Sequence, residues 1–495
     1  MKKLIALILC LFICVSIFSA CGGDDPADTS SNDSSGNNAT STQPVGSGEN
    51  TTEEPKSIDS VAVNDWDGHV FKIFYPVLDN AQADFICDNP NGNVLNDQVY
   101  ARNTMVENLL NINIDCVSQQ SGLTYSGILQ SQFSAGYSEG DYDAVASTSK
   151  AIIKESLKGY TADIMTYDEI NLYAPYWEQG FVDSMTINDS LYAILGDYSA
   201  HSNLCVSALC FNKNLFSQNS LDEPYNLVRN YEWTIDVLLG LMDGFAVDYD
   251  NDGYDWDKDK FALTGWGSSA VYTMFYSTGF TFCKNDGETL SVEYDKELLN
   301  DILDINLDVW VKNGVYINYS GSDTEHHMPH DVFSSGRSLF CDVLLFKVGT
   351  FFSEMDDDYG ILPSPMLNEE QNRYYTYAGY WVPTLVIPKN DINPSRTGNI
   401  LEALSAAGRD VVIPKMFEIV TKIQNARDED SADMIDIVIS NKVYDPAHWL
   451  SLSGYQDLVK SILQEGANTS SGYLKRYHDL AVGELEDYID AYNSK

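Results

Sequence analysis

The stretch HVFKIFYPV (69–77) decides the fold class. Polar and apolar side chains alternate at its start, and most of its residues are apolar. This pattern predicts a buried strand from His69 to Tyr75. In the next segment, NVLNDQVYARNTMVENLLNI (93–112), apolar residues recur at helical spacing. We therefore expect a helix that packs one face against the strand.

The same alternation of elements continues beyond this first unit. INIDCVSQ (112–119) and YDAVASTS (142–149) predict two more strands, with a helix over YSGILQSQFSAG (125–136) between them. The order strand, helix, strand, helix, strand is typical of an α/β fold with a parallel sheet covered by helices on both faces. Ligands of such sheets bind beyond the strand ends, where the topology switches.

The rest of the chain predicts a second region of strands and helices. Further strands are expected in SLYAILGDYSA (190–200), VSALCFNKNLF (206–216), SSGRSLFCDVLLF (334–346), YGILPSPML (359–367) and GYWVPTLVIP (379–388). Helices are expected in YEWTIDVLLGLMDGF (231–245), in DKELLNDILDINLDVWVKNG (295–314) and over most of the last hundred residues. With 44% hydrophobic residues, the chain can bury two cores.

The N-terminus has the features of a secretory signal. Residues 1–20, MKKLIALILCLFICVSIFSA, join a basic start to a short apolar run. Cys21 follows two small residues and resembles the lipidated cysteine of a bacterial lipobox, although Phe18 departs from the usual leucine. Residues 21–57 are polar and predict a disordered acidic and Ser-rich tether, with the fold starting near Ile58. The alternative is a plain signal peptide with an incidental cysteine.

The net charge excludes one class of partner. Removal of residues 1–20 takes away two lysines and no acid, which leaves 27 basic against 73 acidic residues. Such a surface repels phosphate backbones, so we expect no nucleic-acid partner. The cysteines that follow Cys21 show no metal-ligand spacing, and whether they pair or stay free is left open. They are Cys87, Cys116, Cys205, Cys210, Cys283 and Cys341.

An acidic loop, VDYDNDGYDWDKD (247–259), resembles the calcium loop of an EF-hand. The residues at ligand positions 1, 3, 5, 7 and 12 are Asp248, Asp250, Asp252, Tyr254 and Asp259. Gly253 stands at the sharp turn, and hard oxygen ligands at this spacing suit Ca²⁺. Position 12 is Asp instead of Glu. We expect a structural calcium site, and the alternative is a solvated acidic turn.

Two other patterns bear on catalysis. GYSEG (136–140) fits G-x-S-x-G, but the helix precedes it and the strand follows, the reverse of a nucleophile elbow. His326, His327 and His330 cluster in DTEHHMPHD (323–331), where three imidazoles could bind zinc or form a polar loop near a cleft. Paired carboxylates are abundant, and no spacing singles out a glycosidase pair.

The order of these phrases over more than 400 residues carries a family resemblance. The series LYAILGD, VSALCFNKNLF, EWTIDVLL, SGRSLF, YGILPSP and WVPTLVIP resembles the family-1 extracellular solute-binding proteins of ABC importers, the group that includes maltose-binding protein. VLNDQVYARN, PYWEQGFVDSMTINDSLYAILGD and KIQNARDEDSADMIDIVISNKVYD are similar to a lipoprotein subgroup in Gram-positive bacteria.

The resemblance implies a periplasmic-binding-protein-like fold, with two α/β lobes joined by a hinge around a ligand cleft. Residues 58–203 plus 338–381 would form the first lobe, and residues 204–337 plus 382–495 the second. The chain would cross between lobes near 197–206, 337–342 and 379–384. Such a hinge needs a few residues at element ends to absorb the backbone change.

The expected ligand is a sugar, because sugars stack C–H faces on aromatic rings and bond their hydroxyls to polar groups. Aromatic and polar residues beside the inferred crossings or in loops at strand ends are the candidates, although packing is the alternative for each ring. The candidates are Trp177, Asp197, Tyr198, Trp266, Arg337, Tyr380 and Trp381.

The expected protein is not an enzyme. It is a monomeric receptor on the extracellular face of the cell membrane, lipid-anchored through Cys21. It would capture a solute, which we expect to be an oligosaccharide, in the inter-lobe cleft and deliver it to the transmembrane subunits of an ABC permease. Two alternatives stay open, a surface carbohydrate-active hydrolase and a calcium-stabilised adhesion or scaffold lipoprotein.

Overall fold

The computed structural model describes residues 56–493, except 76–83, 86–88, 91, 118–140, 288, 312–313, 319–327 and 424–428. The predicted signal peptide, Cys21, nearly all of the tether, the helix expected at 125–136 and the GYSEG motif lie outside the described residues. The first described element, η1 (Ser57–Ser60), contains Ile58, the predicted start of the fold. The main-chain N–H groups of Ser57 and Ile58 donate to Asp410, which ties this end of the chain to the domain.

The first sheet contains the strand that opened the sequence argument. Its four strands are β1 (His69–Phe74), β2 (Ile112–Val117), β3 (Ala144–Thr148) and β12 (Pro383–Val386), in the order β12-β3-β1-β2. β1 pairs in parallel with β2 and β3, whereas β12 pairs antiparallel with β3. The predicted parallel α/β unit is confirmed for these first three strands.

The helix between β1 and β2 has clear start and stop signals. α1 (Val94–Leu110) begins after Asn93, whose side chain accepts hydrogen bonds from two main-chain N–H groups of the first turn. It ends at Asn111, which takes the left-handed conformation (φ 49°) that asparagine tolerates. Its buried face includes Val106 and Leu110, so the predicted helix and its packing face are confirmed.

The second sheet has five strands and mixed direction. They are β10 (Tyr359–Leu362), β4 (Ser207–Asn212), β9 (Ser338–Leu344), β5 (Phe261–Trp266) and β8 (Val315–Asn318), in the order β10-β4-β9-β5-β8. β4 runs antiparallel to β10 and β9, and β5 runs parallel to β9 and β8. Helices α9 (Gly267–Tyr276) and α11 (Pro329–Ser334) pack against β5 and β9.

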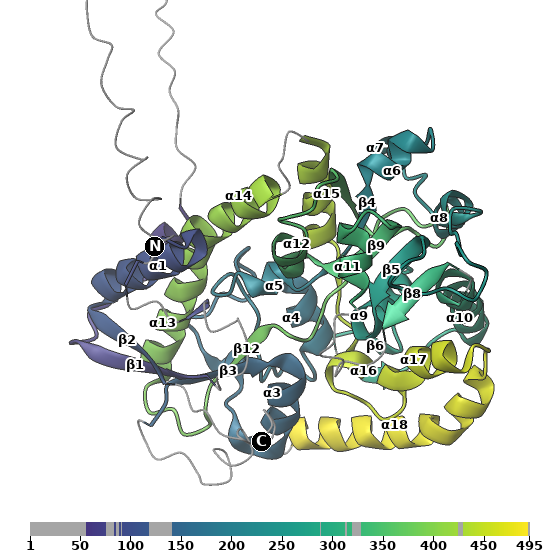
Figure 1. Ribbon diagram of the computed structural model, residues 1–495. Helices are drawn as coiled ribbons and strands as arrows, with labels where there is room; N and C mark the ends of the chain where they lie inside the picture. The colour runs from purple at the N-terminus through teal and green to yellow at the C-terminus, as the bar shows by residue number, and fades with distance from the viewer. Residues whose placement is uncertain are drawn as a thin grey trace, which may run out of the picture. The chain divides into compact units, whose positions relative to one another are not determined.

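The remaining helices and short strands surround these two sheets. Figure 1 shows α18 (Ser470–Asn493, yellow), which packs against α17 (Tyr455–Glu465), β7 (Leu290–Val292) and η3 (Ser156–Tyr160). In chain order the remaining elements are α3 (Ser149–Glu155), η3 (Ser156–Tyr160), η4 (Ile164–Thr166), α4 (Gln179–Met185), α5 (His201–Leu204), α6 (Lys213–Gln218), α7 (Tyr225–Arg229), α8 (Ile235–Met242), β6 (Cys283–Asn285), β7 (Leu290–Val292), α10 (Lys296–Trp310), α12 (Leu345–Phe351), β11 (Thr376–Tyr377), α13 (Pro394–Ala407), η5 (Gly408–Val412), α14 (Ile413–Ile423), α15 (Glu429–Ser440), β13 (Lys442–Val443), α16 (Pro446–Trp449), α17 (Tyr455–Glu465) and α18 (Ser470–Asn493).

Two chain segments cross side by side between the sheets. Val206 forms an antiparallel bridge with Ala378, and the N–H of Gly379 donates to the carbonyl of Cys205 (2.8 Å). One segment leads into β4 of the second sheet, and the other leads into β12 of the first. These four residues, which we call the crossing ribbon, lie at or beside two of the three predicted crossings, those near 197–206 and 379–384.

The third predicted crossing, residues 337–342, is wrong. These residues lie at the start of β9 and within it, and both neighbours of β9 belong to the five-stranded sheet. Instead, the chain passes from the region of the first sheet back to the second between α13, which packs against α1, and α15, which packs against β10. An apolar run alone does not reveal which sheet a strand joins.

The sheet membership of β9 and β12 also differs from the predicted division of the chain. The prediction placed 338–381 with the first lobe and 382–495 with the second. The structure places β9 in the five-stranded sheet with β4 and β12 in the four-stranded sheet with β3. The other predicted boundaries stay predictions.

Candidate functional site

A cavity of about 540 Å³ lies where the crossing ribbon meets β9, α11, α12 and the start of α9. It is lined by His201, Trp266, Ser269, Met328, Pro329, His330, Asp342, Val343, Leu344, Phe346, Lys347, Phe351, Tyr377, Gly379, Tyr380 and Trp381. Gly379 and the two residues after it continue the ribbon along the cavity, so the connection between the sheets forms part of its wall.

Aromatic rings make up much of the cavity wall. His330 lies flat on Phe351, with ring centroids 3.5 Å apart and planes 2° apart, and Trp266 stacks near His330 at 6.3 Å and 19°. Trp381 packs beside Tyr380 at 5.1 Å and keeps 41% of its surface exposed. Flat, partly accessible ring faces of this kind suit the C–H faces of a sugar.

Local structure explains where these rings stand. Trp266 is the last residue of β5 and the N-cap position of α9, so its ring projects where strand and helix meet. His330 is in the first turn of α11, which begins with Pro329 at a position where the missing N–H is not needed. Burial lowers the pKa of His330 below its ordinary value, against a weaker opposite effect of Asp331.

Asp342 is the one acidic residue among the described residues that line the cavity. It sits in the middle of β9, between Leu209 of β4 and Gly265 of β5, and only 2% of its surface is exposed. Neither carboxylate oxygen has a hydrogen-bond partner among the described residues. A buried carboxylate without partners is costly, so such a group needs an explanation.

Burial raises the pKa of Asp342 to about 7. The hydroxyl of Thr273 acts in the opposite direction, but its proton is donated to the carbonyl of Ser269 (3.0 Å). The carboxyl group therefore titrates near neutral pH, where a modest change in its surroundings changes its charge.

Two further polar groups face the cavity. The ammonium of Lys347, on α12, lies over the rings of Phe346 (4.6 Å to the centroid) and Phe351 (6.0 Å). His201, at the start of α5, lies with Nδ1 2.9 Å from the carboxylate of Asp84. The cavity thus has a cationic donor and an oriented imidazole within an apolar wall, whereas the two carboxylate oxygens of Asp342 are buried beneath its surface.

Three of the seven predicted ligand residues line the cavity: Trp266, Tyr380 and Trp381. Two of the others lie in the core. The indole N–H of Trp177 donates to Glu402 (2.9 Å), and the hydroxyl of Tyr198 donates to the carbonyl of Pro383 (2.7 Å). Both side chains are buried, so they stabilise the fold instead of facing a ligand.

The two charged residues predicted from the inferred crossings also have partners within the protein. Asp197 accepts a hydrogen bond from Asn203 (2.9 Å) and pairs with Arg409 (3.2 Å), and burial raises its pKa. Arg337 donates to the main-chain carbonyls of Trp256 (2.6 Å) and Asp259 (3.1 Å). Neither residue lines the cavity.

The sequence contained a signal for Asp342 that the prediction did not use. SLFCDVL is an otherwise apolar strand with one acid at its centre, and a charge in a buried strand requires a special reason. Lys347, Phe351 and His201 gave no comparable signal, because each stands in a short helix with an ordinary pattern. Of the predicted histidine cluster, His326 and His327 lie outside the described residues.

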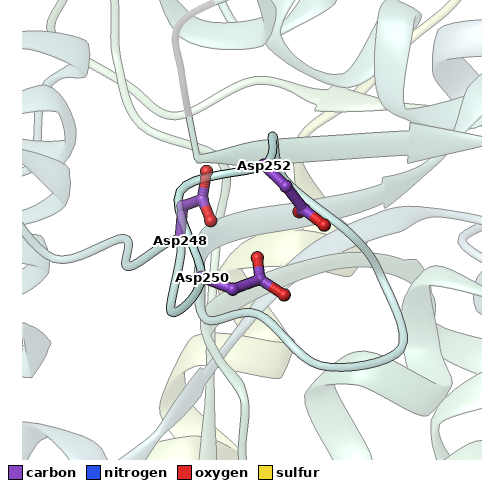
Figure 2. A group of neighbouring side chains, drawn as sticks. All are labelled: Asp248, Asp250 and Asp252. Carbon is purple, nitrogen blue, oxygen red and sulfur yellow. The ribbon is translucent and has the colours of Figure 1, made fainter.

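The acidic loop divides its predicted calcium ligands into two groups. Figure 2 shows Asp248, Asp250 and Asp252, whose carboxylate oxygens lie within 4.8 Å of one another. The ammonium of Lys258 pairs with Asp250 (2.5 Å) and Asp252 (3.2 Å). The loop therefore holds a lysine cation among the carboxylates that the sequence assigned to Ca²⁺.

The other two predicted calcium ligands lie apart from this group. The carboxylate of Asp259 is buried and accepts the N–H groups of Tyr249 (3.1 Å) and Asp255 (2.7 Å), which holds the loop closed. The ring of Tyr254 packs near Phe261 at 5.7 Å. Gly253 has the positive φ (107°) expected at the sharp turn.

The described cysteines and helices bear on two further expectations. Cys116, Cys205, Cys210, Cys283 and Cys341 are free thiols, and Cys87 lies outside the described residues. Among the described residues, no helix is both long and apolar enough to cross a membrane.

Comparison with known proteins shows a likeness of fold. No protein-family model and no curated protein matches the sequence. Among solved structures, an ABC substrate-binding protein from Listeria monocytogenes in complex with cycloalternan superposes with a TM-score of 0.55 at 14% identity, over 85% of this chain and 100% of that one.

Two other solved structures are similar to the same degree. An ABC-transporter solute-binding protein from Thermotoga lettingae, bound with α-D-tagatose, has a TM-score of 0.52 at 14% identity and covers 85% and 100% of the two chains. UspC of M. tuberculosis has a TM-score of 0.51 at 14% identity, over 84% and 99%. The chain has the two-lobed α/β fold of solute-binding proteins, which confirms the fold expected from the resemblance.

Proposed function

We propose that this protein is a solute receptor that captures a sugar, most simply an oligosaccharide, in the ring-lined cavity. One observation carries the proposal. Trp266, Tyr380 and Trp381 present ring faces in a cavity whose wall also contains the buried carboxylate of Asp342. Rings for the C–H faces and a few polar groups for the hydroxyls are the features of a carbohydrate site.

The position of the cavity supports capture by closure. It lies against the crossing ribbon, where the two sheets are connected, so a change of angle at the ribbon changes the shape of the site. A ligand that contacts both sides shifts the equilibrium towards the closed state by its differential affinity. No chemical step is part of this role.

Titration of the purified chain against a panel of neutral oligosaccharides by calorimetry tests the proposal. We expect stoichiometric binding of at least one glycan and no new reducing ends on prolonged incubation. Product formation would indicate a hydrolase instead. Binding of peptides or polyamines and of no glycan would assign the cavity to another solute.

We also propose that the receptor is anchored to the extracellular face of the membrane through a lipid on Cys21 and passes its ligand to an ABC permease. The lipobox-like FSAC and the polar segment after it support this placement. Two or more acyl chains give a durable anchor where one does not. Fatty-acid labelling of cells that express the wild type and Cys21→Ser tests it, because only the wild type should carry label and remain with the membranes.

We further propose that the acidic loop binds Ca²⁺ as a structural clasp. Three carboxylates lie close together there with Lys258 as their counter-charge, and the Lys258 side chain can move away because it lies at the exposed surface. Extracellular modules bind calcium at about 10⁻⁴ to 10⁻³ M, close to the concentration outside cells.

A further inference from the structure

We propose that the cavity prefers a sugar with one negative charge, a uronic acid, and that the ammonium of Lys347 binds its carboxylate. This inference rests on the proposed sugar-binding function and names the substrate class of that same site. It depends on the charge of one lysine, which the other groups of the cavity wall leave uncompensated.

Lys347 is the cation of the cavity wall. It lies on α12, and its ammonium stands over the rings of Phe346 (4.6 Å to the centroid) and Phe351 (6.0 Å). In the part of the chain that the structure describes, no carboxylate lies within salt-bridge distance of this ammonium. Ring faces attract a cation but carry no formal charge, so they do not neutralise it.

The two histidines of the wall do not supply a counter-charge. The carboxylate of Asp84 lies 2.9 Å from Nδ1 of His201. Its negative charge is offset by the buried guanidinium of Arg102, which donates to the main-chain carbonyl of Asp84 (2.7 Å). Burial lowers the pKa of His330 below its ordinary value, so this imidazole is neutral at neutral pH.

The other titratable groups of the wall also leave Lys347 without a counter-charge. The carboxylate oxygens of Asp342 are buried, and burial raises the pKa of Asp342 to about 7, opposed by the hydroxyl of Thr273. A lysine beside this carboxyl group would lower its pKa. Burial raises the pKa of Tyr377 and Tyr380, so both hydroxyls stay neutral. The wall therefore has one positive charge that a guest can compensate.

This charge favours an anionic guest. A neutral guest would take water away from the ammonium without replacing it by an opposite charge, which costs free energy. An anion would replace that water by an ion pair, which is stronger in an apolar cavity than in water. The chain has a formal charge of −44, so attraction of an anion must come from this local site instead of the protein surface as a whole.

A uronic acid fits both the charge and the rings. Its single carboxylate matches the single ammonium and accepts a charge-assisted hydrogen bond from it. Its C–H faces can still stack on exposed aromatic rings such as Trp381. A phosphate group brings up to two negative charges, one more than Lys347 can compensate, and an amino sugar brings a like charge that repels the lysine.

The experiment compares matched ligands by calorimetry. Each neutral oligosaccharide of the panel is paired with the same oligosaccharide oxidised at one C6 to a uronic acid. The primary amide of that acid has nearly the same shape and no charge. We expect the wild type to bind at least one uronate about 10- to 100-fold more tightly than its amide, as expected for a hydrogen bond to a charged group. The 6-phosphate of the same sugar should bind more weakly than the uronate.

Substitutions at Lys347 separate its charge from its packing. Lys347→Met keeps an unbranched side chain over Phe346 and Phe351, and it should bring the affinities for uronate and amide to within about threefold of each other. Lys347→Arg keeps the charge and should retain the preference. Lys475→Met removes an exposed lysine of α18 outside the cavity and, as the matched control, should bind like the wild type. Thermal melting checks that each variant is folded.

Each outcome decides a separate point. If the wild type binds a glycan but no uronate more tightly than its amide, or if Lys347→Met keeps the full preference, the inference is overturned while the receptor function stands. Tighter binding of the 6-phosphate would overturn the assignment to a carboxylate. If the wild type binds neither neutral nor oxidised glycans, the proposed function fails and this inference fails with it.

Discussion

The guanidinium of Arg337 donates a hydrogen bond to the main-chain carbonyl of Asp259 (3.1 Å) and another to that of Trp256 (2.6 Å). Arg337 directly precedes β9, and Asp342 lies five residues further along the same strand. The end of the acidic loop is thus fastened to the strand that carries the buried carboxylate of the cavity.

Arg337→Ala should destabilise the protein without a direct effect on ligand contacts. Loss of two hydrogen bonds from a charged donor removes about 2–4 kcal/mol from the free energy of unfolding, measured by urea denaturation. Arg476→Ala, at an exposed arginine whose contact is the ring of Tyr477, serves as control and should change it little. Equal stabilities of the two variants would contradict the fastening role.

Chelation of calcium should lower the melting midpoint of the wild type, because a ligand bound only to the native state stabilises it by mass action. Asp250→Ala should abolish the difference between melts with calcium and with chelator. Lys258→Met should increase the difference, because it removes the cation that competes for Asp250 and Asp252. Identical melts of the wild type in the two buffers would refute the calcium proposal and leave Lys258 as the native counter-ion.

The pKa of about 7 for Asp342 predicts an unusual pH dependence of stability. The folded state holds a proton there between about pH 4 and pH 7, whereas the unfolded chain has released it. Stability therefore falls as pH rises through this window, by at most about 4 kcal/mol for this group. Asp445, whose pKa burial raises to about 6, contributes in the same direction.

Asp342→Asn should remove the contribution of Asp342. We expect the variant to gain stability relative to the wild type at pH 7.5 and to match it near pH 4.5, as measured by urea denaturation at both values. A constant difference between the two proteins across this range would show that the Asp342 carboxyl does not titrate there.

The tryptophans should separate into two classes. Trp266→Ala and Trp381→Ala should weaken sugar binding by roughly 5- to 30-fold through lost stacking. Trp177→Phe should destabilise the fold by about 1–3 kcal/mol, since it leaves the buried carboxylate of Glu402 without one of its donors. Tyr173→Ala, at a ring that is 83% exposed outside the cavity, is the control for both measurements. A large binding loss from Trp177→Phe in a fully folded protein would contradict this division.

Much of the fold followed from local patterns. The strand at His69, its helix and the next two strands obey the expected periodicities, and the capping by Asn93 and Thr234 places two helix starts where side-chain chemistry favours them. Strand connectivity was harder. β9 and β12 are both short apolar runs, and nothing in such a run says which sheet it will join.

The cavity residues could be predicted where aromatic residues lie at or near the end of a strand. They were missed where the prediction depended on which side chains the fold brings together. Trp266 and Trp381 stand at element ends and do line the cavity. Tyr198 and Trp177 have the same residue types in similar contexts, but their polar atoms found partners in the core. Only the hydrogen-bond partners of those polar atoms show whether such a side chain lines the cavity or lies in the core.

The crossing ribbon leaves no room for a side chain at Gly379. A methyl group on Gly379 would lie 2.8 Å from the sulfur of Cys205 and 3.2 Å from its carbonyl oxygen. Gly379 also borders the cavity, so the connection between the two sheets and the proposed ligand site share the same peptide groups. In the proposed receptor, a change of angle at the ribbon therefore moves this part of the cavity wall, and a bound ligand would oppose that change directly, without a relay of intermediate side chains.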